Sequence, residues 1–394
     1  MSTTRNRWIV LVLFVLMSSG IYQFTAQILV PPRGLRFDFV PRYIGGQAVW
    51  QGINPYSEAV TQNIQIAMFG SVLPPEADQQ RMAYPAYAAV LLAPLLLLPE
   101  QVAVSFWASL QLIAVLLSPI VIMLLNRDRV NPVAFGLLLI ATVFVFRYPI
   151  NLYIIAQFTG TMLLGIVTAL WFILRGWHVA AGIMLALVTL PPTVMLGYAV
   201  VFLGALALVG QWRGAVAYGA TLGVLMLLPM FTIGWWLPAW FDNLVAYADY
   251  SYPVWAPGLL PPLLRPLLVL GTMGGGLYIW NRYRLSQTRN RLIDVAIAAV
   301  VVSLLLVPQT GNYYLVLLIL PLVIIVLRGM QSGQWWVVAG AGLACLSPWI
   351  YQATRELAPN LETLLLPLHV GLLWLLTLVS HSEAKANARM DIRS

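Results

Sequence analysis

Residues 361–379 read LETLLLPLHVGLLWLLTLV, a run in which Glu362 is the only charged residue. A run of about this length is sufficient for a helix that crosses the hydrocarbon core of a bilayer, and residues 133–146 form another apolar run. Of the 394 residues, 61% are hydrophobic and 9% are charged, whereas a typical soluble domain has about 25% charged residues. So few charges cannot cover a surface that faces water. We therefore predict an all-α polytopic membrane protein and exclude soluble enzymes, nucleic-acid-binding proteins and secreted disulfide scaffolds.

Cysteine and histidine are too scarce to indicate a metal centre. Cys345 is the single cysteine, so no internal disulfide is possible, and the three histidines are spread along the chain. We attribute the net charge of +8 to an excess of lysine and arginine in the loops on one side of the membrane, rather than to nucleic-acid binding. Near the N-terminus, basic residues precede an apolar run at 8–17, but no small-residue cleavage site follows. We interpret this segment as a retained first helix.

Apolar segments along the chain predict about 12 transmembrane helices in a single integral membrane domain, residues 1–394. The arginine-rich loop 282–291 is the strongest topological signal, because short basic loops face the cytoplasm. If both termini are cytoplasmic and segment 84–98 is re-entrant or too short to span, most of the 21 lysines and arginines lie inside. In a second model, segment 84–98 spans and 179–209 is one bent helix. Both models place residues 30–81 outside.

The segments 179–190 and 193–209 are separated by Pro191 and Pro192. In the preferred model they form a hairpin whose bend lies at membrane depth, against protein or a water-filled cavity. A simple proline kink is the alternative interpretation, and the sequence does not decide between them.

Residues 30–83 form the largest hydrophilic stretch, the predicted first extracytoplasmic loop. Tyr43–Trp50 alternates small and aromatic residues and predicts a short helix lying on the membrane. Gly52–Tyr56 has the composition of a turn. Ser57–Phe69 is amphipathic, with Ser57 in position to cap the helix. Two juxtamembrane helices that bracket a turn would form a platform on the outer surface.

Asp38 is the candidate general base of this loop. It follows the first helix closely, lies between Phe37 and Phe39, and precedes Arg42 by four residues. A partly desolvated carboxylate just above the membrane is suited to accepting a proton. The alternative is a structural role, as a helix cap or as the partner of Arg42 in an ion pair.

Four sequence elements resemble glycosyltransferase family 87, whose members are membrane enzymes of the GT-C superfamily. The first is Asp38-Phe39 with Tyr43, Trp50 and the turn Gly52–Tyr56. The second is Tyr84-Pro85 followed by a proline-punctuated apolar run, and the third is Asn151-Leu152 with Gln157. The fourth is Ala181-Gly182 before Pro191. The elements occur in the family's order and span most of the chain.

The resemblance implies transfer of one sugar, most simply mannose, from a polyprenyl-phosphate donor to a glycolipid or polysaccharide acceptor in the cell envelope. Lipid phosphate is a competent leaving group, so neither a metal nor another cofactor is expected. Asp38 takes the role of base, and arginines bind the donor phosphate. The candidate phosphate-binding residues are Arg147, Arg265 and Arg42. The candidate residues for binding the sugar or acceptor are Tyr43, Trp50, Tyr56, Tyr84, Asn151, Gln157, Asn312 and Tyr313.

The chain also departs from the family pattern. Leu190 stands where members often have a lysine, and Ala156 precedes Gln157 where a glycine is usual. These departures concern a phosphate contact and leave the donor sugar open, with arabinofuranose the nearest rival to mannose. A secondary transporter and a non-catalytic protein of envelope assembly are the alternative functions. Nearly all charges fall at predicted helix ends, which is unlike an ion-coupled transporter. The site is expected on the outer face of the cytoplasmic membrane.

Overall fold

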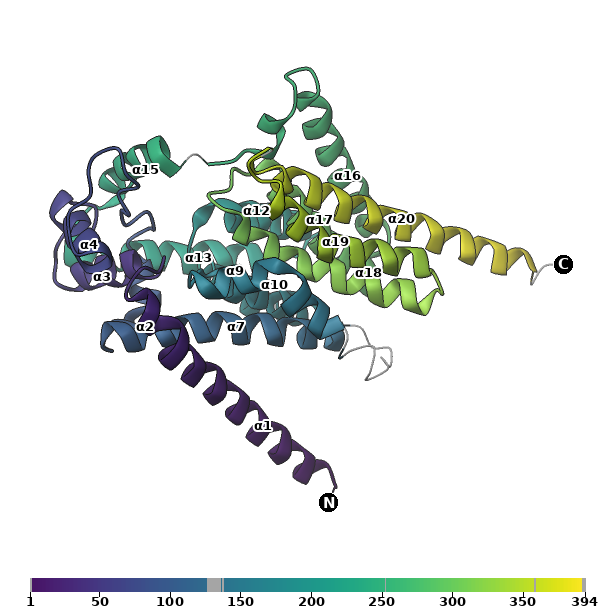
Figure 1. Ribbon diagram of the computed structural model, residues 1–394. Helices are drawn as coiled ribbons and strands as arrows, with labels where there is room; N and C mark the ends of the chain where they lie inside the picture. The colour runs from purple at the N-terminus through teal and green to yellow at the C-terminus, as the bar shows by residue number, and fades with distance from the viewer. Residues whose placement is uncertain (1, 126–135, 137, 252, 358, 392–394) are drawn as a thin grey trace. The chain divides into compact units, whose positions relative to one another are not determined.

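The computed structural model describes residues 2–125, 136, 138–251, 253–357 and 359–391. Helices make up 77% of the structure, and no strand occurs among the described residues, which confirms the all-α class. The chain forms two compact units, and Figure 1 labels most of their helices. The first comprises Met1–Ala114, Asn151–Thr161 and Leu222–Tyr252, and the second comprises Val115–Ile150, Met162–Thr221 and Pro253–Ser394. Each is described by itself.

The first unit begins with a long apolar helix and continues through short helices that surround the candidate site. Its elements, some of which extend into the second unit, are α1 (Ser2–Phe24), the π-helix η1 (Thr25–Leu29), α2 (Val30–Arg33), α3 (Val40–Trp50), α4 (Glu58–Phe69), α5 (Ala88–Leu91), α6 (Ala93–Leu96), α7 (Glu100–Leu125), α9 (Arg147–Ile154), α14 (Met230–Ile233) and α15 (Leu237–Ser251).

The second unit is a helical bundle around α17 (Arg289–Leu306). Almost every residue from Leu292 to Leu305 of this helix is buried, as expected for a helix that is apolar on all sides and packed in a core. The remaining elements are η2 (Ala141–Val145), α10 (Thr159–Leu174), α11 (His178–Leu187), α12 (Pro192–Ala207), α13 (Arg213–Leu227), η3 (Ala256–Leu259), α16 (Arg265–Ser286), η4 (Asn312–Leu318), α18 (Ile319–Gln331), α19 (Trp335–Ala353) and α20 (Glu362–Asp391).

Several apolar helices fit a membrane protein. Four stretches of the described chain are long and apolar enough to cross a bilayer: Leu11–Arg33, Glu100–Leu125, Arg213–Ile233 and Asn312–Gln331. Shorter apolar helices are Thr159–Leu174, His178–Leu187, Pro192–Ala207 and Glu362–Leu378. The figure of about twelve spanning helices stays a prediction.

The predicted breaks in the chain are largely observed. Segment 84–98 forms two four-residue helices, α5 and α6, rather than one continuous helix. The chain is also broken between α11 and α12, at the predicted Pro191. The first residues of the predicted segment 133–148 lie outside the described residues.

The two short helices predicted within residues 30–83 form, with one correction, and their position at the membrane surface stays a prediction. The segment Tyr43–Trp50 lies within α3, and Gly52 adopts φ +74° in the turn that follows. α4 buries Val60, Ile64 and Met68 on one face. Ser57 stands at the N-cap position with extended backbone, but its side chain makes no capping hydrogen bond. The position of the predicted N-cap is therefore confirmed, but the predicted capping hydrogen bond from the Ser57 side chain is wrong.

Candidate functional site

Asp38 lies in the turn between α2 and α3, in the first unit. α2 ends at Arg33 because Gly34 adopts φ +59°, a conformation that glycine tolerates best. The chain then bends, and the backbone N–H of Asp38 donates to the carbonyl of Ile155 at 3.0 Å. Phe37 and Phe39 on either side are fully buried. The buried neighbours and this backbone bond hold the carboxylate beside the end of α9.

A single amide joins the carboxylate of Asp38 to the guanidinium of Arg42. Gln157 donates its Nε2–H to Asp38 Oδ2 at 2.5 Å. Arg42 Nη2 donates to Gln157 Oε1 at 3.0 Å. The amide nitrogen of Gln157 therefore donates and its amide oxygen accepts, so both polar ends of the side chain are hydrogen-bonded. Among the described residues no direct ion pair joins Asp38 to Arg42, so the predicted alternative of an ion pair between them is wrong.

The backbone around Gln157 is unusual. α9 ends at Ile154, and Ala156 takes φ +55°, which is uncommon for a residue with a side chain. Trp107 of α7 donates its indole N–H to the Ala156 carbonyl at 3.0 Å, and Gln157 N donates to the Leu152 carbonyl at 2.9 Å. Alanine therefore occupies a left-handed position that glycine tolerates better. These contacts keep the Gln157 side chain directed at the Asp38 carboxylate.

Arg42 is a fully buried cation with spare hydrogen-bonding capacity. Its side chain is 0% exposed. Its guanidinium lies 4.4 Å from the Tyr84 ring centroid and 5.1 Å from that of Phe158. In the described part of the chain, Arg42 Nε and Nη1 have no hydrogen-bond partner. Buried donors without a partner are costly, so these two nitrogens are suited to binding an anionic ligand.

Burial dominates the electrostatics of Asp38. Desolvation raises the pKa of its carboxyl above the ordinary 3.8, while the charge of Arg42 and the hydrogen bond from Gln157 act in the lowering direction. Arg33 lowers the pKa further, and Asp78 raises it. A carboxylate with a raised pKa is a stronger base than an ordinary surface aspartate, as general-base catalysis requires.

The four aromatic residues predicted to bind the sugar or acceptor in the first unit make different contacts. Tyr43 and Tyr56 are buried, and their hydroxyls donate to the carbonyls of Leu98 at 2.7 Å and Tyr84 at 3.0 Å. Trp50 is 54% exposed, although its indole N–H donates to the Ala89 carbonyl. Tyr84 is partly exposed and lies against Arg42. Trp50 therefore has an exposed ring surface, Tyr84 is only partly exposed, and sugar binding by any of the four stays a prediction.

Two α15 residues that sequence reasoning missed hold the segment that carries Tyr84. Trp240 donates its indole N–H to the Ala83 carbonyl at 3.1 Å. Asn243, which is buried, donates to the Met82 carbonyl at 3.0 Å. Both contacts join positions more than 150 residues apart, so no local sequence pattern predicts them. The family's Tyr-Pro element is thereby fixed from a distant helix.

The other predicted residues belong to different parts of the molecule. Asn151 is in the first unit, on α9. Arg147 is in the second unit, and its Nη1 is buried without a partner among the described residues. Arg265, also in the second unit, donates to the carbonyls of Leu260 at 3.0 Å and Gly258 at 3.3 Å, contacts that occupy much of its guanidinium.

Glu362 organises a polar cluster in the second unit. Tyr148 donates its hydroxyl to Glu362 Oε2 at 2.7 Å, and Asn312 donates its side-chain amide to Oε1 at 2.6 Å. Tyr313, the neighbour of Asn312, shares a hydrogen bond of 2.9 Å with Thr310. Sequence reasoning missed Glu362 as a site residue, and its position as the one acid in a long apolar run was the available signal.

Comparison with known proteins gives one family. The model of glycosyltransferase family 87 matches residues 83–308. The matched range contains Tyr84, Arg147 and Gln157, whereas Asp38 and Arg42 precede it. No curated protein and no solved structure gives a significant match.

Proposed function

Because the chain belongs to glycosyltransferase family 87, we propose that it transfers a single sugar, mannose, from a polyprenyl-phosphate donor to a lipid or glycan acceptor. The observation that carries this proposal is the arrangement of Asp38, Gln157 and Arg42. It combines a base of raised pKa with a buried cation that lacks an anion. The apolar helices are consistent with a lipid-linked donor. The proposal places the reaction on the extracytoplasmic face.

In the proposed reaction Asp38 removes the proton from an acceptor hydroxyl. The hydroxyl oxygen forms a bond to the anomeric carbon of the donor, and the bond from that carbon to the phosphate oxygen breaks. The electron pair leaves with the polyprenyl phosphate, and the anomeric configuration inverts. A positioned base contributes about 10²- to 10⁴-fold to such a step.

Arg42 is proposed to stabilise the charge that develops on the departing phosphate. Two of its guanidinium nitrogens have no partner in the described part of the chain, and burial strengthens each contact with an anion because water does not screen it. Arg147, in the second unit, stays a candidate phosphate-binding residue in its own right, because its Nη1 is buried without a partner among the described residues. Arg265 has less support because backbone carbonyls already accept its hydrogen bonds.

Gln157 is proposed as a positioning residue rather than as a sugar ligand. Its amide keeps the Asp38 carboxylate apart from Arg42 while it hydrogen-bonds to both. A direct Asp38–Arg42 ion pair would lower the pKa of the base and occupy the cation. With the amide between them, both groups stay available to substrates.

The test is the Asp38→Asn variant of the purified full-length protein in detergent. Polyprenyl-phosphate-mannose and, separately, polyprenyl-phosphate-arabinose are supplied with a mixed glycolipid extract, and released polyprenyl phosphate is measured by mass spectrometry. We expect release from one donor, and a loss of about 10²-fold or more in the variant. For the wild type, we expect kcat/KM to fall as the pH drops through the raised pKa of Asp38, because the protonated carboxyl is no base.

Asp242→Asn is the matched control, since Asp242 is an exposed aspartate on α15. It is expected to keep wild-type turnover. Normal turnover by Asp38→Asn would remove Asp38 from the role of base. Equal thermal stability of the variants would show that a loss of activity is not a loss of fold.

A further inference from the structure

A pocket of about 670 Å³ opens on the first unit, apart from the contacts of the Asp38 carboxylate. It lies between the turn that follows α2 and the last turn of α4. The residues that line it are Pro32, Arg33, Gly34, Leu35, Arg36, Ala67 and Met68. Two of these residues carry positive charge and none carries negative charge, so the pocket is electropositive.

Both arginines are held against aromatic rings. The guanidinium of Arg33 lies 5.1 Å from the Phe37 ring centroid, and that of Arg36 lies 5.9 Å from the Phe69 ring centroid. Within the described residues, neither arginine forms an ion pair. Stacking on rings leaves the edges of a guanidinium free, and those edges match the oxygens of a phosphate in a bidentate manner.

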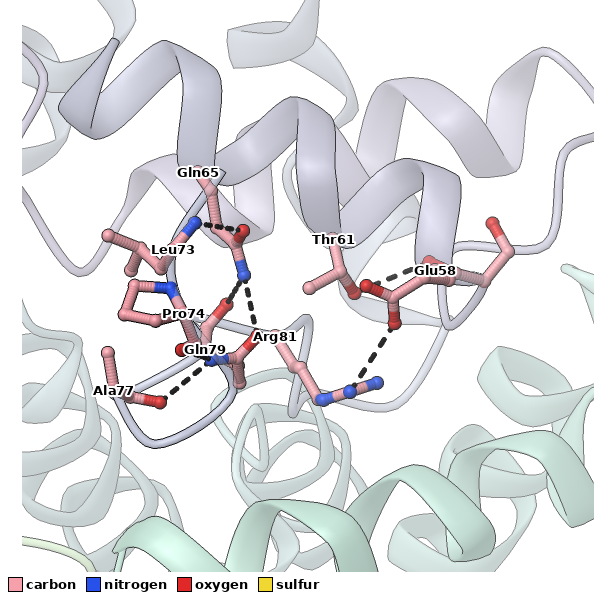
Figure 2. Close-up of polar contacts among 9 residues, drawn as sticks. Glu58, Thr61, Gln65, Leu73, Pro74, Ala77, Gln79 and Arg81 are labelled. Carbon is pink, nitrogen blue, oxygen red and sulfur yellow. Dashed lines mark hydrogen bonds and ion pairs between the residues drawn. The ribbon is translucent and has the colours of Figure 1, made fainter. Parts of the chain in front are cut away.

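A polar network stabilises α4, the helix that lines one side of the pocket. Figure 2 shows Gln65 of α4 accepting from the Leu73 backbone N–H at 2.9 Å and donating to Gln79, whose own side chain donates to Pro74 and Ala77 carbonyls. Arg81 and Glu58 form an ion pair at 3.4 Å at the start of α4. The contacts of Gln65 and Gln79 hold the loop after α4 to that helix, which carries Ala67 and Met68, whereas the ion pair lies at the opposite end of α4.

The pocket lies at the end of a candidate membrane span, because the stretch Leu11–Arg33 finishes at one of its arginines. The end of a spanning helix is at the level of the lipid headgroups, where basic side chains meet phosphate. The lining also has an apolar part, from Pro32, Leu35, Ala67 and Met68. Positive charge at the depth of the lipid headgroups favours a lipid over a free anion.

We propose that the pocket of Arg33 and Arg36 binds the headgroup phosphodiester of an anionic phospholipid from the surrounding bilayer. The bound lipid is a structural ligand of the turn that carries Asp38, and it is neither the donor nor a reactant. The inference therefore goes beyond the proposed reaction, and a measurement of phospholipid binding alone tests it.

The experiment is native mass spectrometry of the full-length protein released from nanodiscs of equal phosphatidylglycerol and phosphatidylcholine. We expect the wild type to retain phosphatidylglycerol selectively. The doubly substituted Arg33→Gln, Arg36→Gln protein is expected to lose about tenfold or more of that selectivity, since each juxtamembrane arginine contributes to anionic-lipid binding. The control is Arg81→Gln, which removes an arginine whose charge Glu58 already balances, and it is expected to behave as the wild type.

A second variant, Ala67→Trp, narrows the pocket without removing charge and is expected to lose the same selectivity. It keeps the test decisive if the double variant does not fold. Undiminished selectivity in folded Arg33→Gln, Arg36→Gln protein or in Ala67→Trp would overturn the proposal. Two competition arms test the source of the phosphate. Displacement of phosphatidylglycerol by millimolar inorganic phosphate would indicate a soluble-anion site, and displacement by polyprenyl phosphate would indicate a donor site. Either result would contradict the lipid assignment.

Discussion

At the scale of single residues, the chemistry depends on the separation of Asp38 from Arg42. The two are four residues apart, a spacing at which opposite charges commonly attract. Here Gln157 lies between them, donating one hydrogen bond to Asp38 and accepting one from Arg42. Arg42 thereby keeps two unpartnered donors inside the protein, counted over the described residues. Such a cation is destabilising unless an anion is bound, and it is therefore the residue at which substrate binding should be most visible.

The variant Arg42→Gln tests this role. We expect binding of polyprenyl phosphate to weaken about 10- to 100-fold, because hydrogen bonds to charged groups contribute about 1.5–3 kcal/mol. The thermal stability of the ligand-free protein should not fall, since the variant removes an incompletely paired buried charge. Binding is measured by isothermal titration in detergent, and stability by thermal unfolding. Unchanged affinity together with a large loss of stability would assign Arg42 a structural role instead.

At the scale of elements, the Ala-Gly motif at 181–182 is explained by helix packing. Gly182 lies on α11, which crosses α13 so closely that a Cβ added at Gly182 would lie 2.1 Å from the carbonyl oxygen of Gly214 and 2.8 Å from the backbone N of Tyr218. Both obstacles are backbone atoms, which cannot rotate away. The glycine is thus required for the approach of two helices in the second unit rather than for chemistry.

Gly182→Ala is expected to destabilise the protein by about 1–3 kcal/mol, the usual cost of overpacking. The matched control is Gly219→Ala on α13, where an added Cβ meets nothing within 4 Å. That change should stabilise slightly, by about 0.5–1 kcal/mol, because alanine is the better helix former. Thermal unfolding of both variants in the same detergent measures the difference. Equal midpoints would contradict the close packing of α11 and α13.

At the scale of the whole molecule, the predicted topology makes a separate claim. It places the loop 30–81 outside and the arginine-rich loop 282–291 in the cytoplasm. The exposed residues Gln51 and Gln287 report on these two loops. Cys345 is a buried free cysteine, so replacing it with alanine gives a background without thiols.

In the Cys345→Ala background, Gln51→Cys should react with a membrane-impermeant maleimide on intact cells. Gln287→Cys should react only after the membrane is permeabilised. The physical reason is that short basic loops are retained in the cytoplasm. Labelling is read as a mass shift on a gel. Reaction of Gln287→Cys in intact cells would reverse the predicted orientation and move the candidate site to the other face.

The sequence by itself determined the helical membrane class, the break at Pro191, and the helices and turn of the first loop. These features follow from composition, proline and hydrophobic periodicity, which act locally. The resemblance to known enzymes also identified the family, and it gave Asp38 and Gln157 as candidate site residues. Only the tertiary structure decided that Gln157 contacts both Asp38 and Arg42, that α15 holds the segment of Tyr84, and that Glu362 pairs with Tyr148 and Asn312. Those partners lie up to 214 residues apart, and contacts between distant side chains are set by packing rather than by any pattern in the neighbouring sequence.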